Sequence, residues 1–180
     1  MVIIMWKEIF IMFLGVYLIR CLTDVYMIKT YNSILKLFKN NKYKEVKEKA
    51  IKNYKIYNLF SIGPFNKAIY KMYDNICYMI ASVYYIENNE RQFLYYLEKI
   101  KKEKEFGKHY FIRSLYFYSY NNHKLANHNY MLYLGSDKLD QDYINILKHI
   151  VEDNDVENVS LENINNSAIL QLVDKIKTMK

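Results

Sequence analysis

The sequence predicts an all-α protein in which an apolar N-terminal helix is followed by a short stack of antiparallel helix pairs. Apolar residues recur at helical spacing along most of the chain. One proline and four glycines in 180 residues are too few for the many turns of a β-sandwich or barrel. No segment shows the period-two alternation of a half-buried strand. With 52% hydrophobic residues, the bulk of the chain carries enough apolar surface to fold.

The chain length suits a single domain with short additions at its two ends. We divide it into an N-terminal membrane-anchor helix at residues 1–28, a helical repeat domain at 29–151, and an acidic link with a C-terminal capping helix at 152–180. The two cysteines, Cys21 and Cys77, exclude a disulfide framework. Cys77 lies on an apolar helical stripe and is expected in the core.

The first element, residues 2–22, contains only three charged residues, Lys7, Glu8 and Arg20. A membrane-spanning helix needs roughly 20 mostly apolar residues, and long basic side chains near its ends can reach the lipid headgroups. The segment lacks the charged start and the small-residue cleavage site of a signal peptide. We therefore predict a single membrane span. A helix buried in the domain core, and an interfacial helix or uncleaved anchor, stay open as alternatives.

The lysines that follow the apolar run predict its orientation. Only Lys7 precedes the run, so the excess of positive charge on its C-terminal side places the following domain in the cytoplasm of a single-pass cell-membrane protein. Lysines next to a span also attract anionic lipids. The candidate lipid-facing residues are Lys29, Lys36, Lys39 and Lys42.

After the apolar segment, amphipathic stripes predict a series of helices, the last of them capped by Ser160. Pairs of asparagines at 40–41, 88–89 and 121–122 each fall between two stripes. Asparagine tolerates the left-handed conformation that tight turns require, so each pair predicts a helix–helix turn. The predicted stripes lie at residues 31–38, 43–54, 65–84, 93–100, 110–118, 126–133, 139–150 and 161–177.

Two stretches between residues 77 and 134 carry similar sets of residues. The first set is Cys77, Ile80, Ala81, Tyr84, Phe93 and Leu97, and the second is Tyr110, Arg113, Ser114, Phe117, Ala126 and Tyr130. This pattern resembles the tetratricopeptide repeat (TPR), a helix–turn–helix unit of 34 residues. Ala81 and Ser114 keep the small residue at the helix crossing. The chain departs from the family at Phe93 and Arg113 and lacks its tryptophan and closing proline, so a plain helical bundle stays open.

The resemblance implies a short α-solenoid that binds a protein or peptide. In such proteins the first helix of each pair lines the binding groove, and tyrosine and asparagine suit a peptide partner. Helix pairs of this kind must stack on their neighbours to bury their apolar faces. The matching groove positions are Asn75, Tyr78, Ser82, Tyr85, Lys108, Phe111, Leu115 and Tyr118.

We found no motif for catalysis, for a metal or for a cofactor. His123 and His128 are five residues apart, which does not place two metal ligands on one helix face. Phosphate-binding loops, nucleophile elbows and zinc-protease motifs do not occur. We therefore predict no enzyme activity, no catalytic residues, no metal and no cofactor. Cys21, at the predicted membrane boundary, is of the kind that can be palmitoylated.

These observations favour a membrane-anchored, TPR-like module that recruits or scaffolds another protein. Two alternatives remain. One is a soluble helical-repeat interaction protein with its N-terminal helix buried. The other is a basic nucleic-acid-binding domain that uses residues 29–55, where nine lysines face two glutamates. The absence of arginine from this stretch disfavours nucleic acid as the partner.

Overall fold

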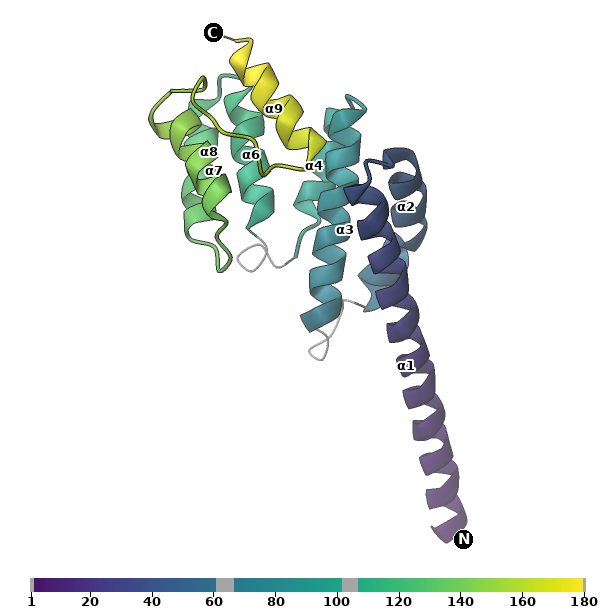
Figure 1. Ribbon diagram of the computed structural model, residues 1–180. Coiled ribbons are helices and arrows are strands. Elements are labelled where there is room, and N and C mark those ends of the chain that lie inside the picture. The colour runs from purple at the N-terminus through teal and green to yellow at the C-terminus, as the bar shows by residue number, and fades with distance from the viewer. Residues whose placement is uncertain (1, 61–66, 102–106, 180) are drawn as a thin grey trace.

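The computed structural model describes residues 2–60, 67–101 and 107–179. Within these ranges the regular structure is helical and there is no strand, which confirms the all-α prediction (Figure 1). The predicted start of the third helix near Phe65 lies outside the described residues. The elements are α1 (Val2–Lys39), α2 (Tyr43–Phe60), α3 (Lys67–Ile86), α4 (Glu90–Glu98), α6 (Lys108–Tyr118), α7 (His123–Leu134), α8 (Gln141–Leu147), the π-helical turn η1 (Lys148–Glu152) and α9 (Ser167–Lys177).

The core of the molecule is a stack of antiparallel helix pairs. Three pairs follow one another along the chain, α1 with α2, α3 with α4, and α6 with α7, and α2 also packs against α3. The second and third pairs meet through aromatic rings, since Phe93 lies 5.2 Å and Tyr85 6.5 Å from the ring of Tyr116. Burial of these large rings joins the pairs into one core.

Each helix pair is joined by a turn in which one asparagine is left-handed. Asn41, Asn88 and Asn121 have φ values of 56°, 58° and 57°. The residue after each one donates its backbone N–H to the carbonyl five residues earlier, which satisfies a carbonyl at the end of the preceding helix. Non-glycine residues other than asparagine and aspartate rarely adopt this conformation. The turns predicted from the asparagine pairs are therefore confirmed.

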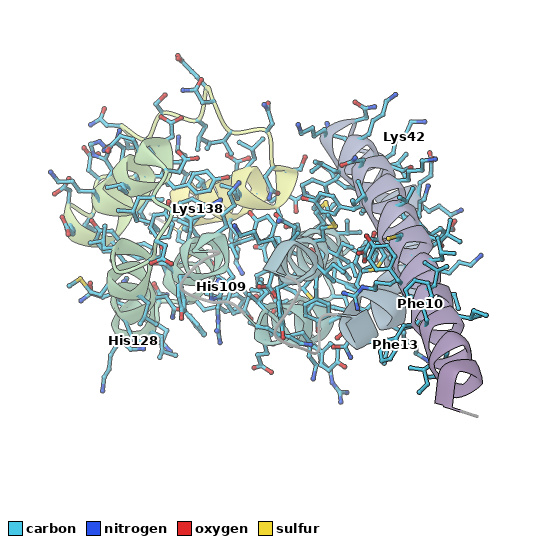
Figure 2. The ribbon with its side chains drawn as sticks, turned by 90° about the horizontal axis from the view of Figure 1, so that it is seen from below. Phe10, Phe13, Lys42, His109, His128 and Lys138 are labelled. Carbon is cyan, nitrogen blue, oxygen red and sulfur yellow. The ribbon has the colours of Figure 1, made fainter. Side chains whose placement is uncertain are left out.

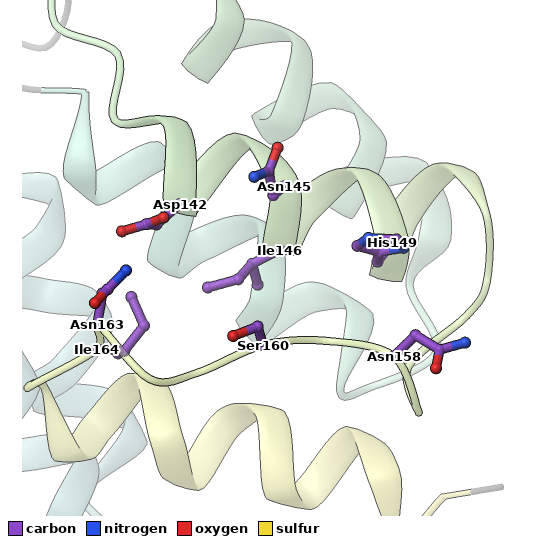
Figure 3. A pocket seen from close by; sticks show the side chains of 8 residues that line it. All are labelled: Asp142, Asn145, Ile146, His149, Asn158, Ser160, Asn163 and Ile164. Atoms are coloured by element: carbon purple, nitrogen blue, oxygen red, sulfur yellow. The ribbon is translucent and has the colours of Figure 1, made fainter.

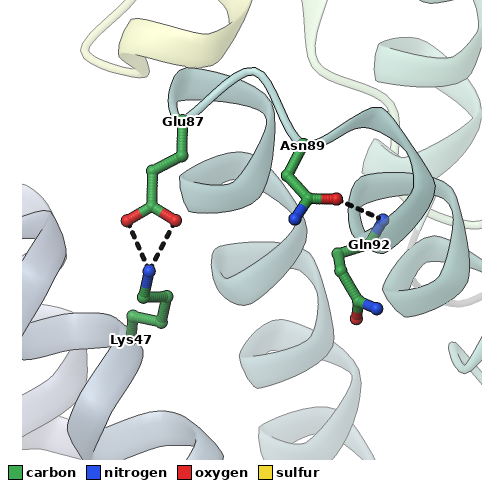
Figure 4. A network of polar contacts seen from close by, with 4 residues as sticks. All are labelled: Lys47, Glu87, Asn89 and Gln92. Carbon is green, nitrogen blue, oxygen red and sulfur yellow. Dashed lines mark hydrogen bonds and ion pairs between the residues drawn. The ribbon is translucent and has the colours of Figure 1, made fainter.

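In two of these turns the second asparagine begins the next helix. The side chain of Asn89 accepts a hydrogen bond from the Gln92 N–H at 3.2 Å, as Figure 4 shows. Asn122 does the same for the Leu125 N–H, also at 3.2 Å. An asparagine pair thus ends one helix and caps the next. This second role is not part of the sequence prediction.

The N-terminal helix is longer than predicted. The sequence predicts an anchor helix up to residue 28 and a separate helix at 31–38, but α1 runs unbroken from Val2 to Lys39. The polar residues between the two stripes stay helical, because Thr23 donates to the Ile19 carbonyl at 2.8 Å and Arg20 pairs with Asp24 at 3.4 Å. The predicted boundary therefore falls inside a continuous helix.

The predicted start of the last helix is wrong. It was expected at Leu161 with Ser160 as its cap, but α9 begins at Ser167, where the Asn166 side chain accepts from the Ala168 N–H at 3.0 Å. The preceding residues, 153–166, are irregular. This stretch is rich in asparagine and acidic residues, whose side chains compete with the backbone for hydrogen bonds and oppose helix formation.

The last helix lies across the first helices of the second and third pairs. α9 packs against α3 and α6 and buries an apolar stripe there, which closes the core on that side (Figure 1). The predicted capping helix thus covers a face of the stack. The buried residues of α9 are Ala168, Ile169, Leu172, Val173 and Ile176.

Candidate functional site

The most unusual surface of the molecule is the N-terminal half of α1. This half of the helix extends away from the remaining helices in Figure 1, and Figure 2 labels Phe10 and Phe13 on it. The side chains of Phe10, Phe13 and Leu22 are 68%, 65% and 71% exposed. Exposed apolar patches of this extent mark contact with a membrane or another protein. The alternative in which this helix is buried in the core is therefore wrong for this structure.

One helix in the described part of the chain is long and apolar enough to cross a membrane. It covers Ile9–Lys39, and its most apolar window has a mean hydropathy of 1.8 with no residue buried. The 21 residues from Val2 to Leu22 extend about 31 Å at 1.5 Å per residue, close to the roughly 30 Å thickness of a bilayer's hydrocarbon core.

The C-terminal half of α1 is held firmly in the domain. Met27 and Ile34 are fully buried. The Tyr57 hydroxyl donates to the Met27 carbonyl, and the Tyr26 hydroxyl donates to Asn53 Oδ1 at 2.7 Å. Since α1 has no break, the exposed half and the buried half form one rigid rod rather than an anchor on a flexible linker.

The face predicted as a peptide groove is covered by the chain itself. Asn166 Nδ2 donates to the Tyr78 hydroxyl at 2.9 Å and to Ser82 Oγ at 3.5 Å, and α9 packs on both helices of the face. Of the eight predicted residues only Lys108 is exposed and Asn75 half-buried. The other six are buried, and they are Tyr78, Ser82, Tyr85, Phe111, Leu115 and Tyr118.

Part of this face remains open as a pocket of about 240 Å³. Three predicted groove residues, Asn75, Tyr78 and Lys108, line it together with Lys39 from the end of α1. A neighbouring hollow of about 280 Å³ shares Asn75 and Lys108 and adds Lys71, Lys138 and others. Pockets of this size are small for a drug-sized ligand, so a partner would contact this surface with only a few side chains.

The four predicted lipid-facing lysines are all exposed, but they do not form one patch. Lys29 and Lys39 are separated by about 15 Å along the helix axis. Lys42 pairs with Glu45 at 3.4 Å, while Lys39 lines the pocket together with Asn75 and Lys108. The structure therefore does not bring these side chains together on one membrane-facing surface.

The basic stretch at 29–55 also fails to form an uninterrupted cationic face. Lys47 makes an ion pair with Glu87 at 2.6 Å, which links α2 to the end of α3 (Figure 4). Lys49 Nζ donates to Ser33 Oγ at 2.6 Å. Several of the lysines are thus engaged within the fold, which gives no support to a nucleic-acid interface.

A polar pocket of about 130 Å³ lies between α8, η1 and the irregular segment before α9 (Figure 3). Asp142, His149 and Ser160 all line it, which are residue types used in nucleophilic catalysis. No hydrogen bond joins these three side chains, and His149 Nδ1 instead faces Asp153 at 3.7 Å. Among these three side chains the structure shows no nucleophile–base hydrogen bond. In the described residues no three histidine, cysteine or acidic side chains gather around a metal position.

Two titratable groups are shifted by burial. Burial, with the positive charge of Arg113 nearby, lowers the pKa of His109 to about 3. Burial raises the pKa of the Cys77 thiol to about 12, which keeps this cysteine in its unreactive neutral form. Both groups lie inside the helical stack and not at a pocket mouth, so their shifts concern stability rather than chemistry.

Comparison of the chain with models of protein families, with curated proteins and with solved structures finds no match in any of the three. The TPR resemblance therefore stays a prediction.

Proposed function

We propose that the chain is a single-pass membrane protein whose cytoplasmic helical domain holds another protein at the membrane. The observation that carries the proposal is the rod-like α1, whose apolar N-terminal half is solvent-exposed while its C-terminal half is part of the domain core. Water does not stabilise such a surface. Lipid removes its apolar area from water at a gain of roughly 25 cal/mol per Å².

The anchor is tested by alkaline extraction of membranes that contain the full chain. The wild-type chain is expected to stay in the membrane pellet. Replacement of Phe13 and Val16 by lysine places two charges in the middle of the span, each costing about 3 kcal/mol, and is expected to release the chain. Replacement of Val25 and Ile28, which are exposed apolar residues of α1 outside the proposed span, by lysine is the control. Release of the wild-type chain would end the proposal.

The orientation is tested with single exposed cysteines in a Cys21→Ser background. A cysteine at Glu98, in the domain, is expected to react with a membrane-impermeant maleimide only after the cells are permeabilised. Burial protects Cys77 from the reagent. Labelling in intact cells would place the domain outside and contradict the positive-inside prediction.

The interaction role is supported by the stacked helix pairs and by the small residues at their crossings. Ala81 and Ser114 are fully buried, and the Ser114 hydroxyl donates to the Ala126 carbonyl at 2.8 Å, which lets α6 and α7 approach closely. This arrangement agrees with a TPR-like repeat.

A photo-crosslinker at Lys108, at the mouth of the open pocket, is expected to give a discrete adduct in membranes, whereas one at Glu157 is not. Identical adduct patterns from Lys108 and Glu157 would contradict the proposal that a partner protein binds at this pocket.

A further inference from the structure

The unbroken α1 determines which end of the domain faces the membrane. α2 runs antiparallel to α1, and their contacts give the register, since Asn53 lies beside Tyr26 and Lys49 beside Ser33. Both helices rise 1.5 Å per residue, so continuing this register places Leu59 level with the turn of α1 that begins at Arg20. The end of α2 therefore reaches the C-terminal end of the proposed span.

Parts of two further elements, the start of α3 and the residues after α4, lie near this end of α2. Lys101 Nζ donates to Asn58 Oδ1 at 2.9 Å, and the Lys101 backbone N–H donates to Asp74 Oδ1 at 2.8 Å. Lys71 lies one turn before Asp74, toward the N-terminal end of α3. Figure 1 shows this end of α3 and the end of α2 on the side from which α1 emerges. We call this surface the basal rim: Lys55, Leu59, Lys71 and Lys101.

The basal rim has the composition of a surface that rests on lipid headgroups. Leu59 is 66% exposed although it is a large aliphatic side chain. Lys55 lies one turn earlier on α2, Lys101 contacts the neighbouring Asn58, and Lys71 lies on α3 at the same end of the domain; all three lysines are exposed. An aliphatic side chain among lysines suits a bilayer interface, where the chain enters the apolar boundary and the ammonium groups meet phosphates.

The lysines at the other end of α1 are too far away for this role. Lys36 and Lys39 lie about 21 and 26 Å beyond Leu22 along the helix axis. Charges are largely screened beyond a Debye length of about 8 Å at physiological ionic strength. With α1 upright, only lysines near the span end can attract the membrane surface.

We infer that the basal rim docks on an anionic bilayer surface, so that the domain stands on the membrane in one orientation. This inference rests on the proposed anchor. An anchored chain without docking would tilt and rotate about its span, whereas docking presents the pocket lined by Asn75 and Lys108 at a set height above the membrane.

The test uses the full chain with Cys21→Ser in phosphatidylcholine vesicles, with and without phosphatidylglycerol. An environment-sensitive fluorophore on Leu59→Cys is expected to shift to the blue, and to be quenched by spin-labelled lipid, only when phosphatidylglycerol is present. The matched probe, on Asn40→Cys at the far end of α1, is expected to stay water-like in both vesicles. Blue-shifted fluorescence at position 40, or a water-like signal at 59 in the anionic vesicles, would overturn the inference.

Charge reversal separates docking from anchoring. The triple variant Lys55→Glu, Lys71→Glu, Lys101→Glu is expected to lower the docked-to-undocked ratio at the probe on position 59 by on the order of a hundredfold, about fivefold for each lysine. The double variant without Lys101→Glu serves if the triple variant loses helicity. The control has the same charge change at Lys36, Lys39 and Lys42, and an equal loss there would refute docking. Alkaline extraction of the same vesicles reports the anchor alone, so a chain that stays anchored with a water-like probe disproves only the docking.

Discussion

The first and third helices are both strongly apolar, but they lie in opposite environments. α3 is surrounded by α1, α2, α4 and α9, and its residues from Tyr73 to Val83 are buried on nearly every side. In α1, most residues from Phe10 to Leu22 are exposed, and this part of the helix extends away from the other helices. An apolar composition alone therefore does not decide whether a helix belongs to a core or to another solvent.

The polar residues of the two helices explain the difference. α3 contains Asp74 and Ser82, whose side chains receive hydrogen bonds from the Lys101 backbone and from Asn166. The run from Ile9 to Ile19 has almost no polar group through which another segment could bind it. Buried polar groups need protein partners, so they mark a helix that is embedded in protein.

The largest expected effect comes from truncation of a core residue in α3. Ile80→Ala is expected to lower the free energy of unfolding by about 2 to 5 kcal/mol, because Ile80 is fully buried. The matched change Ile11→Ala, at a 67% exposed position of α1, is expected to change it by less than about 0.5 kcal/mol. Urea unfolding of the detergent-solubilised chain measures both. An equal loss at Ile11 would show that the two helices do not differ as described.

A pH-dependent effect is expected from His109, which is buried within the α6 region of the core. The folded state holds its pKa at about 3, whereas the unfolded chain binds the proton near pH 6.5. The contribution of His109 to the free energy of unfolding is therefore complete above pH 6.5. As the pH drops from 6.5 toward 3, the free energy of unfolding falls by at most about 1.4 kcal/mol per pH unit. Comparison of thermal unfolding between wild type and His109→Gln isolates this contribution. Identical pH profiles for the two proteins would contradict it.

A smaller effect is expected at the turn that ends α3. Asn88→Ala forces alanine into a left-handed conformation and is expected to cost about 1 to 2 kcal/mol. Asn88→Gly meets no such penalty and is expected to be close to neutral. Denaturant unfolding of the pair separates backbone conformation from loss of the side chain, and equal destabilisation by both changes would argue against the left-handed turn.

The smallest effect is expected from the ion pair between α2 and the end of α3. Lys47 and Glu87 are 29% and 36% exposed, so solvent screens the pair. Lys47→Met is expected to cost no more than about 1 kcal/mol and to lose its effect at high salt. A double-mutant cycle with Glu87→Gln measures the coupling. A coupling that persists at high salt would show a stronger tie between the first two helix pairs.

The sequence predicted the helices better than their ends. Apolar spacing identified the helix pairs, and asparagine pairs identified the turns, because both depend on interactions between residues close in the chain. The sequence predicted a boundary at residue 28, where the uniformly apolar run gives way to an amphipathic stripe, but such a change of pattern does not break a helix and α1 continues to Lys39.

The predicted site was less accurate than the predicted fold. The groove positions were carried over from a family resemblance that says nothing about the segment that follows the repeats. In the structure that segment lies over the face, with Asn166 bonded to Tyr78, 88 residues earlier. The sequence did not reveal the basal rim either, because Leu59, Lys71 and Lys101 reach the same end of the domain only when α2, α3 and α4 pack side by side.

The sequence by itself determined the all-helical architecture, the left-handed turns and an apolar segment long enough for a bilayer, since these follow from local backbone preference and composition. Only the tertiary structure decided that α1 remains exposed at one end and buried at the other, and that α9 covers the predicted groove. The physical reason is that burial is a property of contacts between distant segments. Many arrangements of the same helices satisfy the same local patterns.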